Sequence, residues 1–214
     1  MNKYLKLSIG LLLQALGIAL VIKSNSTFPI TAFNLGVANT LAISYGTASM
    51  LVELVTILIN CCFKEKIGLT TIASAILNGY IVDLFLHLIP DVSFNLIYLP
   101  IGALTMCFGF YFMSSCGLGL NSSNGLMNAI IKQTGKSVAL IRTLEEMTFM
   151  TLGYILGGTV NITTIILSTC FGSLLGFVYR MLNFEPEKVQ HKNLTFKIHH
   201  ENKGGIKNGA MEKN

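Results

Sequence analysis

The stretch Ile67–Ser74, IGLTTIAS, begins a long apolar run, and 93 residues later Val160–Leu167, VNITTIIL, begins another with the same Thr-Thr-Ile tripeptide. A repeat is sought first because a fixed internal period decides the architecture. Other residues match at this spacing or at one residue less: Glu53 with Glu146, Gly79 with Gly172, Gly10 with Gly102 and Gly17 with Gly109. The sequence therefore predicts two copies of one unit, about 7–89 and 99–182.

The composition is that of a membrane protein. Hydrophobic residues make up 52% of the 214 residues and charged residues 12%, whereas soluble domains are about 25% charged. The runs lack the strict alternation of a β-barrel, so we expect an all-α membrane domain over residues 1–182 with about six transmembrane helices. These helices are predicted from six nearly charge-free runs: Leu7–Ile22, Gly46–Phe63, Leu69–Ile89, Pro100–Ser115, Ser137–Gly157 and Ile162–Leu182.

The positions of the lysines predict the orientation. With six spans and a cytoplasmic N-terminus, only Lys23 lies in an outer segment. The inner segments hold the polar tail, residues 183–214, and six lysines: Lys3, Lys6, Lys64, Lys66, Lys132 and Lys136. Basic residues gather on the cytoplasmic side. We therefore expect both termini in the cytoplasm and a disordered tail.

Each copy also holds a shorter amphipathic segment, residues 30–42 and 123–133. These are too short for an unassisted span. If they do not cross, each copy has three spans, and the second copy inserts upside down. Inverted repeats are the layout of many secondary transporters. If they cross, the copies have four spans and are parallel; the sequence leaves open whether they cross, re-enter or lie on the membrane.

Acidic residues within the apolar runs are the first candidates for substrate or ion binding. Glu53 and Glu146 would lie roughly 10 and 14 Å into the bilayer. Entering from opposite faces, both would lie near the midplane, where a carboxylate usually faces water, an ion path or a partner. If the two glutamates are functional, we expect them to couple protons; if they are structural, we expect them to form hydrogen bonds between helices.

Two further charged groups are candidates because of their helical spacing. Asp83 stands four residues before His87, so the two could pair or lie at the headgroup boundary. Arg142 stands four before Glu146, which predicts an ion pair within one helix, while Glu145 would point toward a neighbouring helix.

Thr31, Ser123 and Asn124 stand at the starts of the two short segments. Free N–H groups at a helix start could hold an anionic group. We find no nucleophile beside a base, no His-Glu-x-x-His, no phosphate-binding loop and no metal-ligand spacing of the five cysteines. We therefore expect no enzyme activity, catalytic residue, cofactor, metal site or nucleic-acid partner.

Several motifs carry a family resemblance: Ser44–Ser49, Gly125–Met127, Arg142–Thr143 with Glu146, and Gly157–Val160. Over residues 7–182 the chain resembles the YczE/YyaS/YitT group of bacterial integral membrane proteins. The resemblance implies a duplicated multi-helix layout in the bacterial cell membrane and a presumed transport role. That group tends to carry Pro-x-Asp where this chain has Pro29–Thr31 and Ser122–Asn124, so a loop-carboxylate mechanism is in doubt here.

The leading hypothesis is a small secondary transporter of a polar or anionic small molecule, with proton coupling through Glu53 and Glu146. The alternative is a non-transporting membrane protein that binds or regulates a partner. An intramembrane enzyme ranks last. The expected partners are the lipid bilayer and a small molecule or ion, and the small size is compatible with a homodimer. The sequence identifies neither the substrate nor the direction of transport.

Overall fold

The computed structural model describes residues 2–63, 65, 67–90, 95–119, 122–185 and 189. The elements of this part are all helical, which confirms the all-α prediction. They are α1 (Lys3–Lys23), α2 (Pro29–Leu41), α3 (Tyr45–Cys62), α4 (Leu69–Ala73), the π-helical η1 (Ser74–Asn78), α5 (Gly79–Leu88), the 3-10 helix η2 (Asn95–Ile97), α6 (Tyr98–Ser115), α7 (Ser122–Thr134), α8 (Val138–Ile155) and α9 (Ile162–Met181). The predicted tail, 183–214, lies outside the described residues except for 183–185 and 189.

The helices begin where the sequence offers capping groups. The hydroxyl of Ser44 accepts the N–H of Thr47 at 3.2 Å, and that of Ser137 accepts the N–H of Leu140 at 3.4 Å. Pro29 is the first residue of α2, a position where its missing N–H costs nothing. These caps explain why α3 and α8 start 93 residues apart, each directly after a serine.

In the part of the chain that the structure describes, four helices are long and apolar enough to cross a membrane: α1, α3, the continuous rod Leu69–Leu88 formed by α4, η1 and α5, and α9. The predicted spans in α6 and α8 are also helices, each of 18 residues. The first half of α8 carries Arg142, Glu145 and Glu146, which lowers its hydropathy.

The surface shows the polarity expected in lipid. Leu58, Tyr154, Ile155 and Ile162 are between 65% and 74% exposed, although each is large and apolar. Several polar side chains, among them that of Asn60, are buried inside the protein. This distribution is unfavourable in water, where exposed apolar surface costs about 25 cal/mol per Å², and it fits a protein surrounded by acyl chains.

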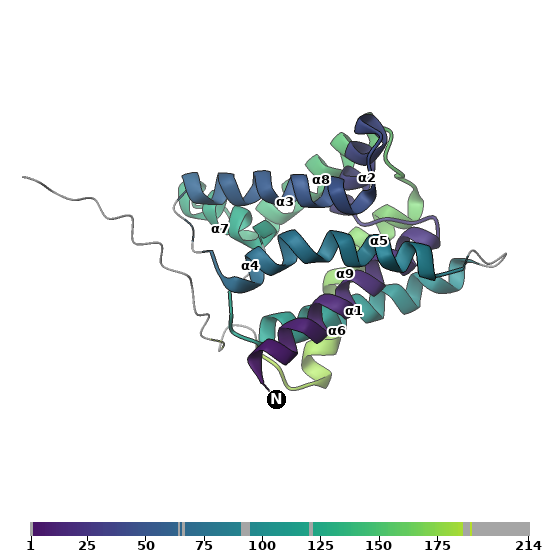
Figure 1. Ribbon diagram of the computed structural model, residues 1–214. Coiled ribbons are helices and arrows are strands. Elements are labelled where there is room, and N and C mark those ends of the chain that lie inside the picture. Colours follow the sequence, from purple (N-terminus) through teal and green to yellow (C-terminus); the bar gives the residue numbers. More distant parts are fainter. Residues whose placement is uncertain are drawn as a thin grey trace, which may run out of the picture.

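Helices α1 and α6 form an antiparallel pair with the most extensive contact between any two helices (Figure 1). A Cβ placed on Gly10 would meet the backbone of Gly109 at 3.1 Å, and one on Gly17 would meet that of Gly102 at 2.7 Å. Glycine is required here because any side chain would push the two backbones apart. Small residues give membrane helices this close approach.

The other helices pack on this pair or on one another. Helix α5 contacts α1 and α3, and α9 contacts α6. The two short helices pack on long ones: α2 on α8, and α7 on α3. They lie toward opposite ends of α3 (Figure 1).

The threonines of the two tripeptides connect distant parts of the chain. Thr163 donates to the hydroxyl of Ser26 at 2.7 Å, and the hydroxyls of Thr164 and Thr27 lie 3.1 Å apart. In the other tripeptide the N–H of Thr70 donates to the carbonyl of Leu118 at 3.2 Å. The starts of α9 and α4 are thus each bound to the loop that follows α1 or α6.

Candidate functional site

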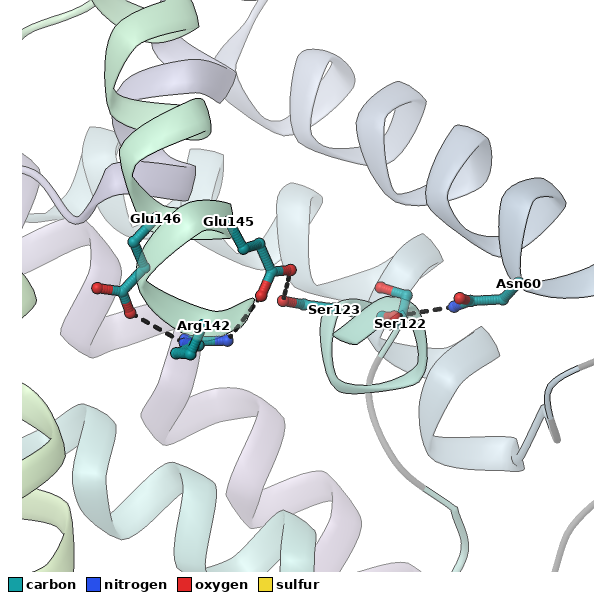
Figure 2. Close-up of polar contacts among 6 residues, drawn as sticks. All are labelled: Asn60, Ser122, Ser123, Arg142, Glu145 and Glu146. Carbon is teal, nitrogen blue, oxygen red and sulfur yellow. Dashed lines mark hydrogen bonds and ion pairs between the residues drawn. The ribbon is translucent and has the colours of Figure 1, made fainter. Parts of the chain in front are cut away.

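A cluster of polar side chains, which we call the α7 site, lies at the amino end of α7. It runs from Glu146 through Arg142, Glu145, Ser123 and Ser122 to Asn60, and it joins α8, α7 and α3 (Figure 2). These contacts bring charged side chains of the long helix α8 and an amide of the long helix α3 to the first turn of the short helix α7.

Glu53 is the carboxylate on the α3 side of this site. It is the ninth residue of an 18-residue helix, so it lies halfway along. The hydroxyl of Ser122, the first residue of α7, donates to it. No cation pairs with Glu53 among the described residues.

Glu145, and not Glu146, is the carboxylate of α8 that faces α7. Glu145 is 9% exposed and accepts a hydrogen bond from the hydroxyl of Ser123 at 3.0 Å. This contact confirms that Glu145 points toward a neighbouring helix. Glu146 pairs with Nε of Arg142 at 2.9 Å, which confirms the predicted pair within the helix. Arg142 also contacts Glu145, at 3.4 Å.

Asn60 completes the site from α3. Its amide nitrogen donates to the carbonyl of Ser122 at 2.8 Å, and it is 2% exposed. The amide lies against Gly125 of α7. A Cβ added to Gly125 would come within 2.8 Å of the Asn60 side-chain nitrogen. Gly125 therefore allows α7 to approach α3 closely at this point.

Asp83 lies apart from this site. Its carboxylate accepts the N–H of Gly46 at 2.8 Å, so it caps the start of α3 from α5. A carboxylate is favourable there because the helix start carries unpaired N–H groups and a partial positive charge. His87 does not pair with that carboxylate; its Nδ1 contacts the carbonyl of Asp83 at 2.8 Å. The structure thus gives Asp83 a role in packing α5 against α3.

The candidate residues of the short helices are divided between two places. Thr31, in the first turn of α2, is 2% exposed and lies with Asn34 beside the hydroxyl of Tyr45. Ser123 belongs to the α7 site. The side chain of Asn124 lies outside the part that the structure describes.

The chemistry of the α7 site is that of hydroxyls, amides, carboxylates and one guanidinium. Within the described residues, no group of three or more His, Cys, Asp and Glu side chains is placed to hold a metal ion. The arrangement can exchange a proton or hold a small cation near Glu53, while Arg142 compensates the charge on α8.

Comparison with known proteins places the chain in a family. A family model described as "Family of unknown function (DUF6198)" matches residues 1–180. The chain belongs to this family. It is 29% identical over 188 residues to an uncharacterized protein of Haemophilus influenzae, covering 82% of this chain and 84% of the relative. No solved structure matches.

A second relative bears on the predicted resemblance. The chain is 26% identical over 176 residues to the uncharacterized membrane protein YczE of Bacillus subtilis, covering 78% of this chain and 81% of that protein. With the family match, this similarity confirms that the DUF6198 chain is a YczE-type membrane protein.

Sequence reasoning missed the roles of Ser122, Asn60 and Tyr45. One signal could have found Asn60: it stands seven residues after Glu53 in an apolar run, so both lie on one helix face. Nothing in the sequence indicated that Ser122 would reach α3.

Proposed function

We propose that this DUF6198 protein is a small secondary transporter that moves a polar solute or ion with proton or cation coupling. The observation that carries this proposal is a polar stripe along the whole of α3. Its members stand four, four, three and four residues apart: Tyr45, Ser49, Glu53, Thr56 and Asn60. Such spacing puts them on one face of the helix. Each is buried or half-buried.

Short helices meet the stripe at both ends. The first turns of α2 and α7 supply Thr31 beside Tyr45 and Ser122 beside Glu53. Polar side chains are expensive within a membrane and usually mark a solute or ion path. A stripe that extends along a full span, with a carboxylate at its centre, is what such a path needs.

We also infer an inverted repeat, which supports the same proposal. The limits of α2, α3 and the α4–α5 rod recur as those of α7, α8 and α9 at a spacing of 93 residues. The contact between α1 and α6 is reciprocal, because Gly10 lies against Gly109 and Gly17 against Gly102. A pair of equivalent antiparallel helices has a two-fold axis perpendicular to them, which in a bilayer lies in the membrane plane. We infer three spans in each copy.

The same layout accounts for the short helices and the charges. Each short helix is 13 residues, about 20 Å long, which is less than the ~30 Å hydrocarbon core. We infer that α7 extends from mid-depth beside Glu53 to the cytoplasmic face, where Lys132 pairs with Glu65, and that α2 lies on the outer side. Both termini are then cytoplasmic.

The acidic groups favour a cationic or neutral polar solute over an anionic one. Glu53 and Glu145 both contact the first turn of α7, so the helix end that could attract an anion is already faced by carboxylates. The corresponding start of α2 carries Pro29 and has no side-chain cap. The coupling site is therefore proposed for α7 alone.

A test is electrical recording from reconstituted protein on a solid-supported membrane, with rapid jumps of pH, sodium chloride or methylammonium chloride. Wild-type protein is expected to give a transient current with at least one jump. Ser49→Val, which places a branched apolar group on the stripe, is expected to reduce this current about fivefold. Thr105→Val is the control, since among the described residues the hydroxyl of the half-buried Thr105 bonds only to the carbonyl of Ile101 in its own helix. A wild-type current no larger than that of protein-free liposomes would contradict the proposal.

A further inference from the structure

One buried oxygen at the α7 site has no hydrogen-bond partner among the described residues. Among the described residues, Asn60 has an amide oxygen that is buried and without a hydrogen-bond partner, although its nitrogen donates to Ser122. Leaving such an acceptor unpaired is unfavourable, because it lost its bonds to water on burial. The amide points to the amino end of α7 (Figure 2), so the missing partner belongs in this site.

The hydroxyl donors around the site are already used. Ser122 donates its hydroxyl to Glu53, and Ser123 donates to Glu145. Arg142 divides its guanidinium between Glu145 and Glu146. Neither hydroxyl is therefore left to donate to the Asn60 oxygen.

The charges lead to the same conclusion. Three carboxylates, Glu53, Glu145 and Glu146, share one guanidinium, and that guanidinium contacts only the two carboxylates of α8. Glu53 keeps an uncompensated charge when it is ionised. An unpaired ion is strongly unfavourable away from water, so a single positive charge would neutralise it.

We propose that a monovalent cation binds between the Glu53 carboxylate and the Asn60 amide oxygen, at the first turn of α7. Hard cations and ammonium groups both accept carboxylate, amide and hydroxyl oxygens as partners. An alkali metal ion and the ammonium group of a protonated amine therefore share the chemistry that this site offers. The inference rests on the proposed function, since this cation would be the coupling ion or the solute.

The test is equilibrium binding of radiolabelled sodium or methylammonium to the purified full-length protein in detergent. We expect one of the two probes to bind saturably and to be displaced by its unlabelled form; which one binds distinguishes an inorganic ion from an amine. Asn60→Ala is expected to weaken this binding at least tenfold. Asn60→Asp, which keeps an oxygen at the same place, is expected to retain it and guards against a folding defect.

Asn78→Ala is the matched control, because Asn78 also has a buried amide oxygen without a partner but stands on η1. It is expected to bind like the wild type. Binding of neither probe, or binding that Asn60→Ala leaves unchanged, would overturn the cation site. Currents that depend on Ser49 without cation binding would refute this inference alone, whereas cation binding without any current would refute transport alone.

Discussion

Gly79→Val is expected to leave the protein unable to fold. A Cβ on Gly79 would lie 2.4 Å from the carbonyl oxygen of Gly46, and one on Gly46 would lie equally close to the carbonyl of Gly79. Both obstacles are backbone atoms, which no rotamer change can move. Overpacking of this kind costs about 3 kcal/mol or more, a large part of the 5–15 kcal/mol that typically stabilises a protein. The measurement is the yield of monodisperse protein by size-exclusion chromatography and its unfolding temperature.

Gly172→Val is the matched control for this prediction. Gly172 stands 93 residues after Gly79, at the corresponding place in α9, yet a Cβ there meets nothing within 4 Å. The variant is expected to unfold within a few degrees of the wild type. Equal unfolding temperatures of the two variants would contradict the close packing of α3 on α5.

Glu53→Gln is expected to abolish the current of the reconstituted protein, with a loss of at least tenfold. Glutamine keeps the size of the side chain and can accept the hydrogen bond from Ser122, but it neither takes up a proton nor carries a charge. Because no described cation compensates Glu53, its charge is the one that must be neutralised during each cycle. Solid-supported-membrane recording at matched protein density measures this loss.

Glu65→Gln is the control for the carboxylate. Glu65 pairs with Lys132 at 2.6 Å; the lysine side chain is 67% exposed and that of Glu65 10%. Lys132 stands in the last turn of α7, away from the first turn that Glu53 contacts. The current of the Glu65→Gln variant should remain close to that of the wild type. A Glu53→Gln protein with a wild-type current would exclude Glu53 from coupling.

Much of the fold could be predicted from apolar patterning. The six nearly charge-free runs all fall in helices, and the segments predicted as short helices, 30–42 and 123–133, are α2 and α7. This worked because lipid leaves an isolated backbone segment only the helix. The π-helical turn Ser74–Asn78 was not predicted, since nothing local in the sequence distinguishes it.

The site was predicted less well, for a physical reason. Glu145 and Glu146 are neighbours about 100° apart around α8, and only the contact with α7 decides which one faces inward. Asp83 has the residue type and depth of an ion ligand, but the approach of Gly46 makes it a helix cap. Which way a polar side chain points depends on helix packing, and a single sequence does not contain that information.

Labelling of single cysteines would test the inverted arrangement most directly. Leu41 and Thr134 are exposed last residues of α2 and α7, 93 residues apart. Leu41→Cys and Thr134→Cys, each in a cysteine-free background, would be treated with a membrane-impermeant maleimide in intact and in opened cells. We expect position 41 to react in intact cells and position 134 only after opening. Reaction of both from the same side would contradict the inverted repeat and, with it, the transport path along α3.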